Sequence, residues 1–470
     1  MDDLDNELLI VETLINRAKT AQISYENLGS QQIFDLASQA VAWAVMQPDN
    51  NKSLSELAVS ETGLGNVTDK IKKNHNKTLG LMRDLQDKKT FGHLSDDQAK
   101  GLSTYLRPKG VIAAIVPSTN PIATPTNNII NALKTGNAII LAPSPKGAKP
   151  LSLLLEKIYI ELEKINVDKD LIQILPGVPS KLITAHLMKM ADLVIVTGSR
   201  GNVEAGYTSG TPAIGVGVGN VVTIIDETAK LDEASKKIAE SKIFDNATSC
   251  SSENSIIAVK PVYEKLLQNL VDEGGMVLNQ EQTETLEEIH WENGKLNKTL
   301  LAKDIKIVLS ELKLEKIAPK DCKFLIVPQS KIGPDYPLSG EKMALCLSLY
   351  KASDFKSALI KAVSIQSFQG AGHSIGIHTT NDDRAHEIAR YAQTCRVIVN
   401  QAHCFATGGF FNNGSPFSLS MGCGSWGKNT IDDNLTWEHF VNRVNIVRTI
   451  PENKPTLEHI FSDYWRKYGK

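Results

Sequence analysis

The chain has 470 residues, of which 41% are hydrophobic and 22% are charged. This composition excludes a disordered or fibrous protein, and the length exceeds what one hydrophobic core serves, so we expect two or three domains. The 51 basic and 53 acidic residues leave a formal net charge of -2. Such a balance does not indicate nucleic-acid binding, and lysine-rich stretches such as Lys70, Lys72 and Lys73 are interpreted as solvated helix faces.

The amino-terminal residues include Asp2, Asp3 and Asp5 and no basic stretch ahead of an apolar run. Signal and transit peptides have the opposite pattern, so neither is expected. The apolar runs have the length of strands and are too short to cross a membrane. Six scattered cysteines, without CxxC pairs or histidines at zinc spacing, indicate reduced thiols and no metal site. These features predict a cytoplasmic protein with no membrane partner.

The spacing of the hydrophobic residues changes along the first half of the chain. Helical spacing over residues 8–18 and 33–44 predicts two helices. After residue 107, continuous apolar runs alternate with helical segments. The predicted strands are residues 110–116, 137–141, 171–175 and 192–196, and the predicted helices between them are residues 128–133 and 151–162. Alternation of this kind is typical of an α/β protein with a parallel sheet covered on both faces.

A glycine-rich stretch, residues 210–220, precedes a second α/β block that starts near Val222. The predicted strands of this block are residues 255–259, 324–327 and 373–378. Beyond residue 400 the content of Gly, Asn and Ser rises, and residues 437–447 form an amphipathic segment. We therefore expect one domain over residues 1–221, a second over residues 222–405 and a carboxyl-terminal segment over residues 406–470.

Cys250 lies in a loop of small polar residues, Asp245-Asn-Ala-Thr-Ser-Cys-Ser-Ser-Glu253, just before an apolar strand. A nucleophilic thiol needs open approach and nearby dipoles that favour the thiolate, and Ser and Thr neighbours supply both. The pattern predicts a nucleophile. The alternative is a cysteine that only fills space in the interior.

Two further motifs follow predicted strands. Asn120 lies in Pro117-Ser-Thr-Asn-Pro121, where ligands of open α/β sheets collect, and its amide could donate to a developing oxyanion. An ordinary Asn-Pro turn is the alternative. The second motif, Val196-Thr-Gly-Ser-Arg-Gly201, precedes a helical stretch and suits a phosphate group. It is not the GxGxxG fingerprint, and Gly198 could simply end a strand.

Five segments carry a resemblance to a known family: PSTNPIATP (117–125), GNAIILAPSPKGAKP (136–150), ATSCSSENS (247–255), GAGHSIGIH (370–378) and NNGSPFSLSMGCGSWGKN (412–429). Nearly the whole chain resembles the aldehyde dehydrogenase superfamily, and specifically its CoA-acylating branch, which includes sulfoacetaldehyde, succinate-semialdehyde and acetaldehyde dehydrogenases. The resemblance implies a cofactor domain, a catalytic cysteine domain and a bridging segment near residues 95–108. It also implies a homodimer or homotetramer, with residues 406–470 as a return and oligomerisation segment.

The resemblance implies roles for individual residues. Cys250 matches the family nucleophile, and Asn120 matches the residue that stabilises the oxyanion. Glu341 matches the acid that holds the nicotinamide ribose, although the proline expected a few residues later is absent. Gly198 and Ser199 match the loop on the pyrophosphate side. The other residues expected to bind the nicotinamide cofactor are Pro117, Ser118, Ser144, Pro145, Lys146 and Gly217.

Two departures from the wider superfamily narrow the expected reaction. Hydrolytic members carry a Glu-Leu-Gly-Gly motif whose Glu activates water, and this chain has Gly215-Val-Gly-Val-Gly-Asn220 there. Without that base, acyl transfer to the thiol of CoA is favoured over hydrolysis. The Lys and Glu that usually hold the adenosine ribose are also replaced, and Ser144 and Lys146 could accept a 2′-phosphate. This favours NADP over NAD, unless Lys146 is only a solvated residue at a helix start.

The run of residues 396–405, together with residues 413–421, is most similar to the sulfoacetaldehyde branch. Arg396 and His403 could meet an anionic head group. The expected reaction converts sulfoacetaldehyde to sulfoacetyl-CoA through a thioacyl intermediate on Cys250, and succinate semialdehyde and acetaldehyde are alternative substrates. His373 could assist CoA, and structural roles are the alternative for both histidines. A catalytically inactive assembly subunit is the alternative class, disfavoured because Cys250 and Asn120 are both present.

Overall fold

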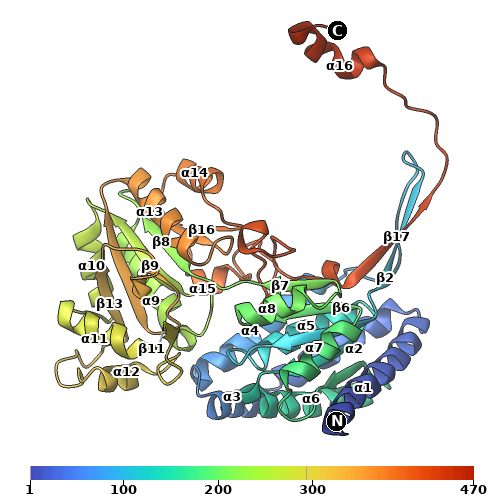
Figure 1. The fold of residues 1–470 in the computed structure, drawn as a ribbon, viewed down its shortest axis with the longest axis horizontal. Helices are drawn as coiled ribbons and strands as arrows, with labels where there is room; N and C mark the ends of the chain where they lie inside the picture. Colours follow the sequence, from blue (N-terminus) through green and yellow to red (C-terminus); the bar gives the residue numbers. More distant parts are fainter. Residues whose placement is uncertain (1, 293) are drawn as a thin grey trace.

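The chain folds into two lobes and a projecting arm, and the structure, a computed structural model, describes residues 2–292 and 294–470 (Figure 1). Four helices come first in the chain: α1 (Asp2–Asn27), α2 (Gln31–Met46), α3 (Pro48–Thr62) and α4 (Val67–Leu85). The helices predicted over residues 8–18 and 33–44 are thus confirmed within α1 and α2. Ser30 and Asn66 cap α2 and α4, because each side chain accepts the backbone N–H three residues ahead.

The first lobe contains a five-stranded parallel sheet with the order β5-β4-β3-β6-β7. Its strands are β3 (Val111–Val116), β4 (Ala138–Pro143), β5 (Ile172–Ile174), β6 (Leu193–Thr197) and β7 (Ala213–Val216), and the helices between them are α5 (Ala123–Lys134), α6 (Ala148–Glu163), α7 (Lys181–Met190) and α8 (Arg200–Tyr207). The two central strands β3 and β4 are buried throughout, as expected for strands covered on both faces. The strand order reverses between β3 and β6, and ligands of such sheets bind at this switch point.

The second lobe contains a seven-stranded parallel sheet with the order β10-β13-β14-β9-β8-β15-β16. Its strands are β8 (Val221–Ile225), β9 (Glu253–Val259), β10 (Gly275–Val277), β13 (Phe324–Gln329), β14 (Cys346–Ala352), β15 (Ile375–His378) and β16 (Val397–Val399). Each lobe has its own hydrophobic core. The prediction of an α/β fold with two parallel sheets is therefore confirmed, and the chain passes from one sheet to the other between Val216 and Val221.

Further helices and short turns complete the two lobes. The helices are α9 (Leu231–Ile243), α10 (Tyr263–Asp272), α11 (Gln280–His290), α12 (Ile305–Glu311), α13 (Phe355–Phe368), α14 (Asp383–Tyr391) and α15 (His403–Ala406). Strands β11 (Trp291–Glu292) and β12 (Lys295–Leu296) form a short antiparallel pair. Single 3₁₀ turns are η1 (Pro145–Gly147), η2 (Lys169–Leu171), η3 (Phe244–Ala247), η4 (Pro337–Ser339), η5 (Ser425–Gly427) and η6 (Trp437–Phe440).

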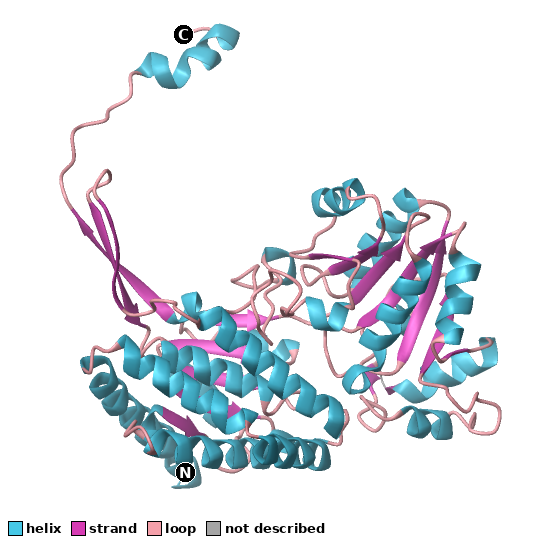
Figure 2. Cartoon of the chain, turned by 180° about the vertical axis from the view of Figure 1, so that it is seen from behind, coloured by secondary structure: helices cyan, strands magenta, loops and turns pink. Residues whose placement is uncertain are grey.

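An arm leaves the first lobe and carries the carboxyl end of the chain away from both lobes (Figure 1, Figure 2). It is an antiparallel sheet of β1 (Gly92–Asp97), β2 (Leu102–Pro108) and β17 (Val441–Val447), with β2 in the middle. The predicted bridging segment lies in this sheet, and the amphipathic segment over residues 437–447 becomes η6 followed by β17. A helix, α16 (Leu457–Tyr468), ends the arm, and none of its residues is buried. Within the described ranges, no helix combines the length and the apolarity needed to cross a membrane.

Candidate active site

The two sheets face each other across a cleft of about 880 Å³. The first lobe contributes residues that directly follow β3, β4 and β6, so the carboxyl ends of three neighbouring strands meet at the cleft. The second lobe contributes the residues that precede β8, β9 and β14. The cleft therefore lies at the switch point of the first sheet, where the fold class predicts a ligand site.

Most of the residues expected to act in catalysis or cofactor binding come together in this cleft. The predicted residues that line it are Pro117, Ser118, Asn120, Ser144, Pro145, Gly198, Ser199, Gly217, Cys250 and Glu341. Lys146 is exposed in the turn η1, outside the lining. His373, Arg396 and His403 also lie outside the lining.

Arg396 and the two histidines form hydrogen bonds with protein groups. The Nη1 of Arg396 donates to the carbonyl oxygens of His373 (3.1 Å) and Gly422 (2.8 Å). The hydroxyl of Ser374 bridges His373 Nδ1 and His403 Nε2, each at 2.8 Å. Burial lowers the pKa of His373 to about 3 and the pKa of His403 well below its ordinary value, so both rings are neutral. Arg396 Nη2 and His403 Nδ1 find no hydrogen-bond partner within the described part of the chain, and the expected contact of these two residues with an anionic head group stays a prediction.

Cys250 is partly exposed in the loop between α9 and β9. Burial raises the pKa of its thiol to about 12, and the nearby charge of Glu341 adds to the rise. The expectation that this loop favours the thiolate is therefore wrong, because the loss of hydration outweighs the backbone hydrogen bond and the charge of Lys73, which lower the pKa. In the protein without ligands, Cys250 is a thiol.

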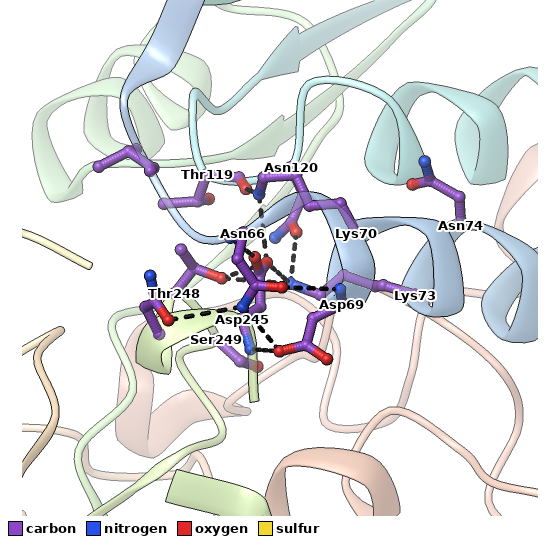
Figure 3. Close-up of polar contacts among 12 residues, drawn as sticks. Asn66, Asp69, Lys70, Lys73, Asn74, Thr119, Asn120, Asp245, Thr248 and Ser249 are labelled. Atoms are coloured by element: carbon purple, nitrogen blue, oxygen red, sulfur yellow. Dashed lines mark hydrogen bonds and ion pairs between the residues drawn. The ribbon is translucent and has the colours of Figure 1, made fainter. Parts of the chain in front are cut away.

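The loop that carries Cys250 is anchored by the buried carboxylate of Asp245 (Figure 3). Its Oδ2 lies 3.1 Å from Lys70 Nζ and 2.5 Å from Lys73 Nζ, and its Oδ1 accepts the backbone N–H of Asn66 at 3.0 Å. Burial alone would raise the pKa of Asp245, but the two ammonium groups outweigh it and hold the pKa below its ordinary value. Two charges from α4 thus pair with one charge from the other lobe.

The interpretation of Lys70, Lys72 and Lys73 as one solvated face is corrected by this arrangement. Only Lys72 is exposed, whereas the side chains of Lys70 and Lys73 are 5% and 6% exposed. Residues 70, 73 and 77 have the spacing i, i+3 and i+7, which places all three lysines on the inward face of α4. From this spacing, the inward position of the three lysines could have been predicted from the sequence.

Asp245, Asn246 and Ala247 all have left-handed backbone angles, with φ of 49°, 51° and 59°. Each such residue costs about 1–3 kcal/mol and persists only when its surroundings hold it in place. The surroundings include the Thr248 hydroxyl, which donates to Asp245 Oδ2 at 2.6 Å, and the Asp245 N–H, which donates to Asp69 Oδ2 at 2.8 Å. The ion pairs of Asp245 therefore hold a strained turn three residues before the thiol.

The same lysines position Asn120. Lys73 Nζ donates to Asn120 Oδ1 at 3.0 Å, and Lys70 Nζ donates to the carbonyl oxygen of Thr119 at 3.2 Å (Figure 3). Because the amide oxygen of Asn120 is bound to Lys73, the amide N–H groups are the ones left to donate to a ligand. This is the orientation that an oxyanion requires.

The glycine segment before β8 leaves no room for an acidic side chain next to Cys250. A Cβ at Gly219 would lie 2.1 Å from the carbonyl oxygen of Cys250, and a Cβ at Gly217 would lie 3.3 Å from the sulfur of Cys423. Among the described residues that line the cleft, Glu341 is the only acid. Burial raises the pKa of Glu341 to about 8.

The strand ends of the first lobe fit a nicotinamide dinucleotide. The hydroxyl oxygen of Ser144 is buried and finds no hydrogen-bond partner within the described part of the chain. Ser199 caps α8, so Gly198 and Ser199 lie at the amino end of that helix, which favours a phosphate charge. An unsatisfied hydroxyl and such a helix end, both in the lining of the cleft, are suited to ribose and phosphate oxygens.

Comparison with known proteins agrees with this geometry. Residues 10–284 match the family model described as the aldehyde dehydrogenase family. The chain is 47% identical to the sulfoacetaldehyde dehydrogenase (acylating) of Cupriavidus necator, over 98% of this chain and 93% of that protein. It is 36% identical to the succinate-semialdehyde dehydrogenase (acetylating) of Clostridium kluyveri, over 97% and 100%. The crystal structure of an acetylating aldehyde dehydrogenase from Geobacillus thermoglucosidasius superposes with a TM-score of 0.92 at 30% identity, covering 97% of this chain and 100% of that one.

Substitution of Asp245 tests the ion pairs that hold the loop. We expect Asp245→Asn to lower the free energy of unfolding by about 3–5 kcal/mol, because two buried ammonium groups lose their counter-ion. Since the folded-state pKa of Asp245 is lowered, its contribution is present above about pH 4 and is lost as the pH falls further. Urea unfolding at pH 7 measures the change.

Asp170→Asn is the control, because Asp170 pairs with a half-exposed Arg17 and should contribute no more than about 1 kcal/mol. Equal losses in the two variants would contradict the argument.

The pH dependence of thiol alkylation tests the state of Cys250. Because the pKa is near 12, the thiolate fraction should rise about tenfold for each pH unit between pH 7 and pH 9. The rate of iodoacetamide modification, read by mass spectrometry of the Cys250 peptide, should rise in the same proportion. Cys250→Ala provides the background from other thiols, including the partly exposed Cys395. A rate that levels off below pH 8 would show that the thiolate is already formed.

Proposed function

The chain belongs to the aldehyde dehydrogenase family, and we propose that it is an acylating enzyme that interconverts sulfoacetaldehyde, CoA and NADP⁺ with sulfoacetyl-CoA and NADPH. The observation that carries this proposal is a cleft in which Cys250 and Asn120 lie together, while residues 215–220 supply no carboxylate to activate water. Similarity to the Cupriavidus necator enzyme supports sulfoacetaldehyde as the substrate. Succinate semialdehyde is the second candidate, supported by the Clostridium kluyveri enzyme.

The first half of the reaction forms a bond between the Cys250 sulfur and the aldehyde carbon. The thiol proton is released to the solvent of the cleft, and the positive charge of Lys73 favours the thiolate that attacks. The carbonyl oxygen becomes an oxyanion, to which the Asn120 amide and the backbone N–H of Cys250 donate. Because Lys73 fixes the orientation of Asn120, its donor is in place before the charge develops.

The second half of the reaction transfers the acyl group to CoA. When bound, the nicotinamide accepts a hydride from the substrate carbon, which leaves the acyl group on Cys250 as a thioester. The CoA thiolate then attacks that thioester and releases the Cys250 thiolate, so one thioester replaces another at little cost in free energy. The enzyme therefore also runs as an acyl-CoA reductase.

The residues at the strand ends hold the nicotinamide cofactor in this proposal. Ser144 and Lys146 meet the adenosine ribose and its 2′-phosphate, Gly198 and Ser199 the pyrophosphate, and Glu341 the nicotinamide ribose. Pro117, Ser118, Pro145 and Gly217 shape the walls. NAD⁺ is the alternative cofactor. Residues 1–221 then form the cofactor domain, residues 222–405 the catalytic domain and residues 406–470 the return and oligomerisation segment.

We infer that the arm joins two copies of the chain in a homodimer or homotetramer. On α16, Leu457, Ile460, Phe461, Tyr464 and Tyr468 recur at helical spacing, and each is at least 43% exposed. A helix of 12 residues is marginal on its own in water, so its apolar face needs a partner. Strand β17 pairs on one side only, with β2, which leaves a free edge for a second chain.

A coupled assay tests the reaction. Purified protein with sulfoacetaldehyde and NADP⁺ should form NADPH only when CoA is added, and Cys250→Ala should abolish this signal. Cys322→Ala is the matched control, because Cys322 is buried in a separate apolar cluster of the second lobe and should leave most activity intact. Equal rates without CoA would indicate a hydrolytic dehydrogenase. No signal with any aldehyde would support the inactive assembly subunit.

Light scattering after gel filtration tests the arm. Phe461→Glu places a charge on the apolar face of α16 and should shift the protein toward smaller assemblies. Ser462→Glu adds the same charge at the neighbouring position, away from that face, and should leave the mass unchanged. If the two variants have the same mass as the wild-type protein, α16 does not hold the assembly together.

A further inference from the structure

Lys77 lines the cleft and forms no ion pair with the side chains that the structure describes. Lys77 lies on α4 one turn beyond Lys73, and its ammonium donates to the carbonyl oxygens of Gly408 (2.7 Å) and Gly409 (2.9 Å). Among the residues whose side chains the structure describes, no carboxylate oxygen lies within 4.0 Å of it. An ammonium has three N–H donors, so one of them remains for a ligand in the cleft.

The charge of Asp84 acts on Lys77, but both carboxylate oxygens of Asp84 have other partners. The Oδ1 of Asp84 is paired with Arg83 at 2.8 Å, and its Oδ2 accepts the backbone N–H of Phe417 at 2.7 Å. Burial lowers the pKa of Lys77 to about 8, which still leaves most of the group protonated at neutral pH. A charge with little hydration and no counter-ion is unfavourable, so an anion placed next to it is bound strongly.

The whole cleft has an excess of positive charge. Four lysines, Lys72, Lys73, Lys77 and Lys181, line it against the single acid Glu341. The charge of Lys73 is already paired with Asp245, and Lys72 is exposed at the surface. Of the described α4 lysines that line the cleft, Lys77 is therefore the one that is partly buried and not paired with a carboxylate.

The position of Lys77 suits the far end of a short substrate. Lys73 holds Asn120 at the oxyanion position, and Lys77 follows four residues later, about 6 Å further along the helix axis. Aromatic side chains form part of the cleft wall beside these lysines: Phe417 has its ring centroid 5.3 Å from Lys77 Nζ, and Phe405 packs between Phe244 and Phe410 at 4.8 and 5.5 Å between centroids.

We propose that Lys77 binds the anionic head group, a sulfonate or carboxylate, of a short aldehyde whose carbonyl lies at Cys250 and Asn120. This inference rests on the proposed function and names the residue that selects the substrate class. Arg396 and His403, which the sequence suggested for this role, lie outside the cleft lining. The head group supplies the counter-ion that the protein itself lacks at Lys77.

Specificity measurements on Lys77 variants test the proposal. The kcat/KM values for sulfoacetaldehyde and for neutral propionaldehyde are measured in the wild-type protein, Lys77→Met and Lys77→Gln. We expect the ratio of sulfoacetaldehyde to propionaldehyde to fall about tenfold to a hundredfold in both variants, as for loss of a charge-assisted hydrogen bond. Lys77→Gln can still donate to Gly408, which keeps the test valid if Lys77→Met is poorly folded. Lys149→Met, which removes an exposed lysine paired with Glu61, should keep the wild-type ratio.

Binding of ethanesulfonate, an unreactive sulfonate, gives a second measurement that does not depend on turnover. Calorimetry should show binding to the wild-type protein and to Lys149→Met, and a tenfold or greater loss of affinity in both Lys77 variants. An unchanged specificity ratio together with unchanged ethanesulfonate affinity would overturn the proposal. So would a rise in the KM for CoA alone, which would assign Lys77 to a phosphate of CoA.

The wild-type protein separates this inference from the proposed function. CoA-dependent reduction of NADP⁺ with a preference for sulfoacetaldehyde supports the proposed function whatever the Lys77 variants do. The same preference retained in Lys77→Met and Lys77→Gln overturns only the role of Lys77. If the wild-type protein reduces NADP⁺ with neutral aldehydes but has no preference for anionic ones, both the proposed substrate and the role of Lys77 are overturned, while the acylating chemistry stands.

Discussion

The active site depends on one buried carboxylate shared by two lysines across the lobes. Asp245 belongs to the lobe of the nucleophile, whereas Lys70 and Lys73 belong to α4 of the other lobe. Breaking a buried ion pair is far more costly than breaking an exposed one, so the pairing fixes both sides. The loop of Cys250 and the proposed oxyanion donor Asn120 take their positions from the same pair of ammonium groups.

The raised pKa of the Cys250 thiol has a consequence for its reactivity. Oxidation and alkylation require the thiolate, so a cysteine held as a thiol is protected while the cleft contains no substrate. The positive charge of α4 acts on groups that arrive in the cleft, and it favours anions. Helix α4 thus stabilises the loop through Asp245 even while Cys250 is held as an unreactive thiol.

The sequence predicted what depends on local pattern. Continuous apolar runs identified the strands that became β3, β4 and β6, and Pro117 marked the end of the first of them. The partnership of Lys73 with Asp245 joins residues 172 positions apart, and no local pattern contains it. The sequence around Cys250 also does not show how far the folded protein removes water from the thiol, and this desolvation raises the pKa that the polar loop was expected to lower. The placement of Arg396 and His403 outside the cleft lining could not be predicted for a related reason, because charge type alone does not tell whether a side chain faces a cleft or a backbone carbonyl.

The left-handed turn at residues 245–247 has a consequence for the biosynthesis of the protein. Its strain is held by contacts from α4, which the ribosome completes long before Asp245 is made. A chain whose lobes have not yet docked lacks those contacts, so its cysteine loop is free to relax out of the working geometry. The working geometry of the cysteine loop therefore forms only when the two lobes have docked, which makes it one of the last features that folding completes.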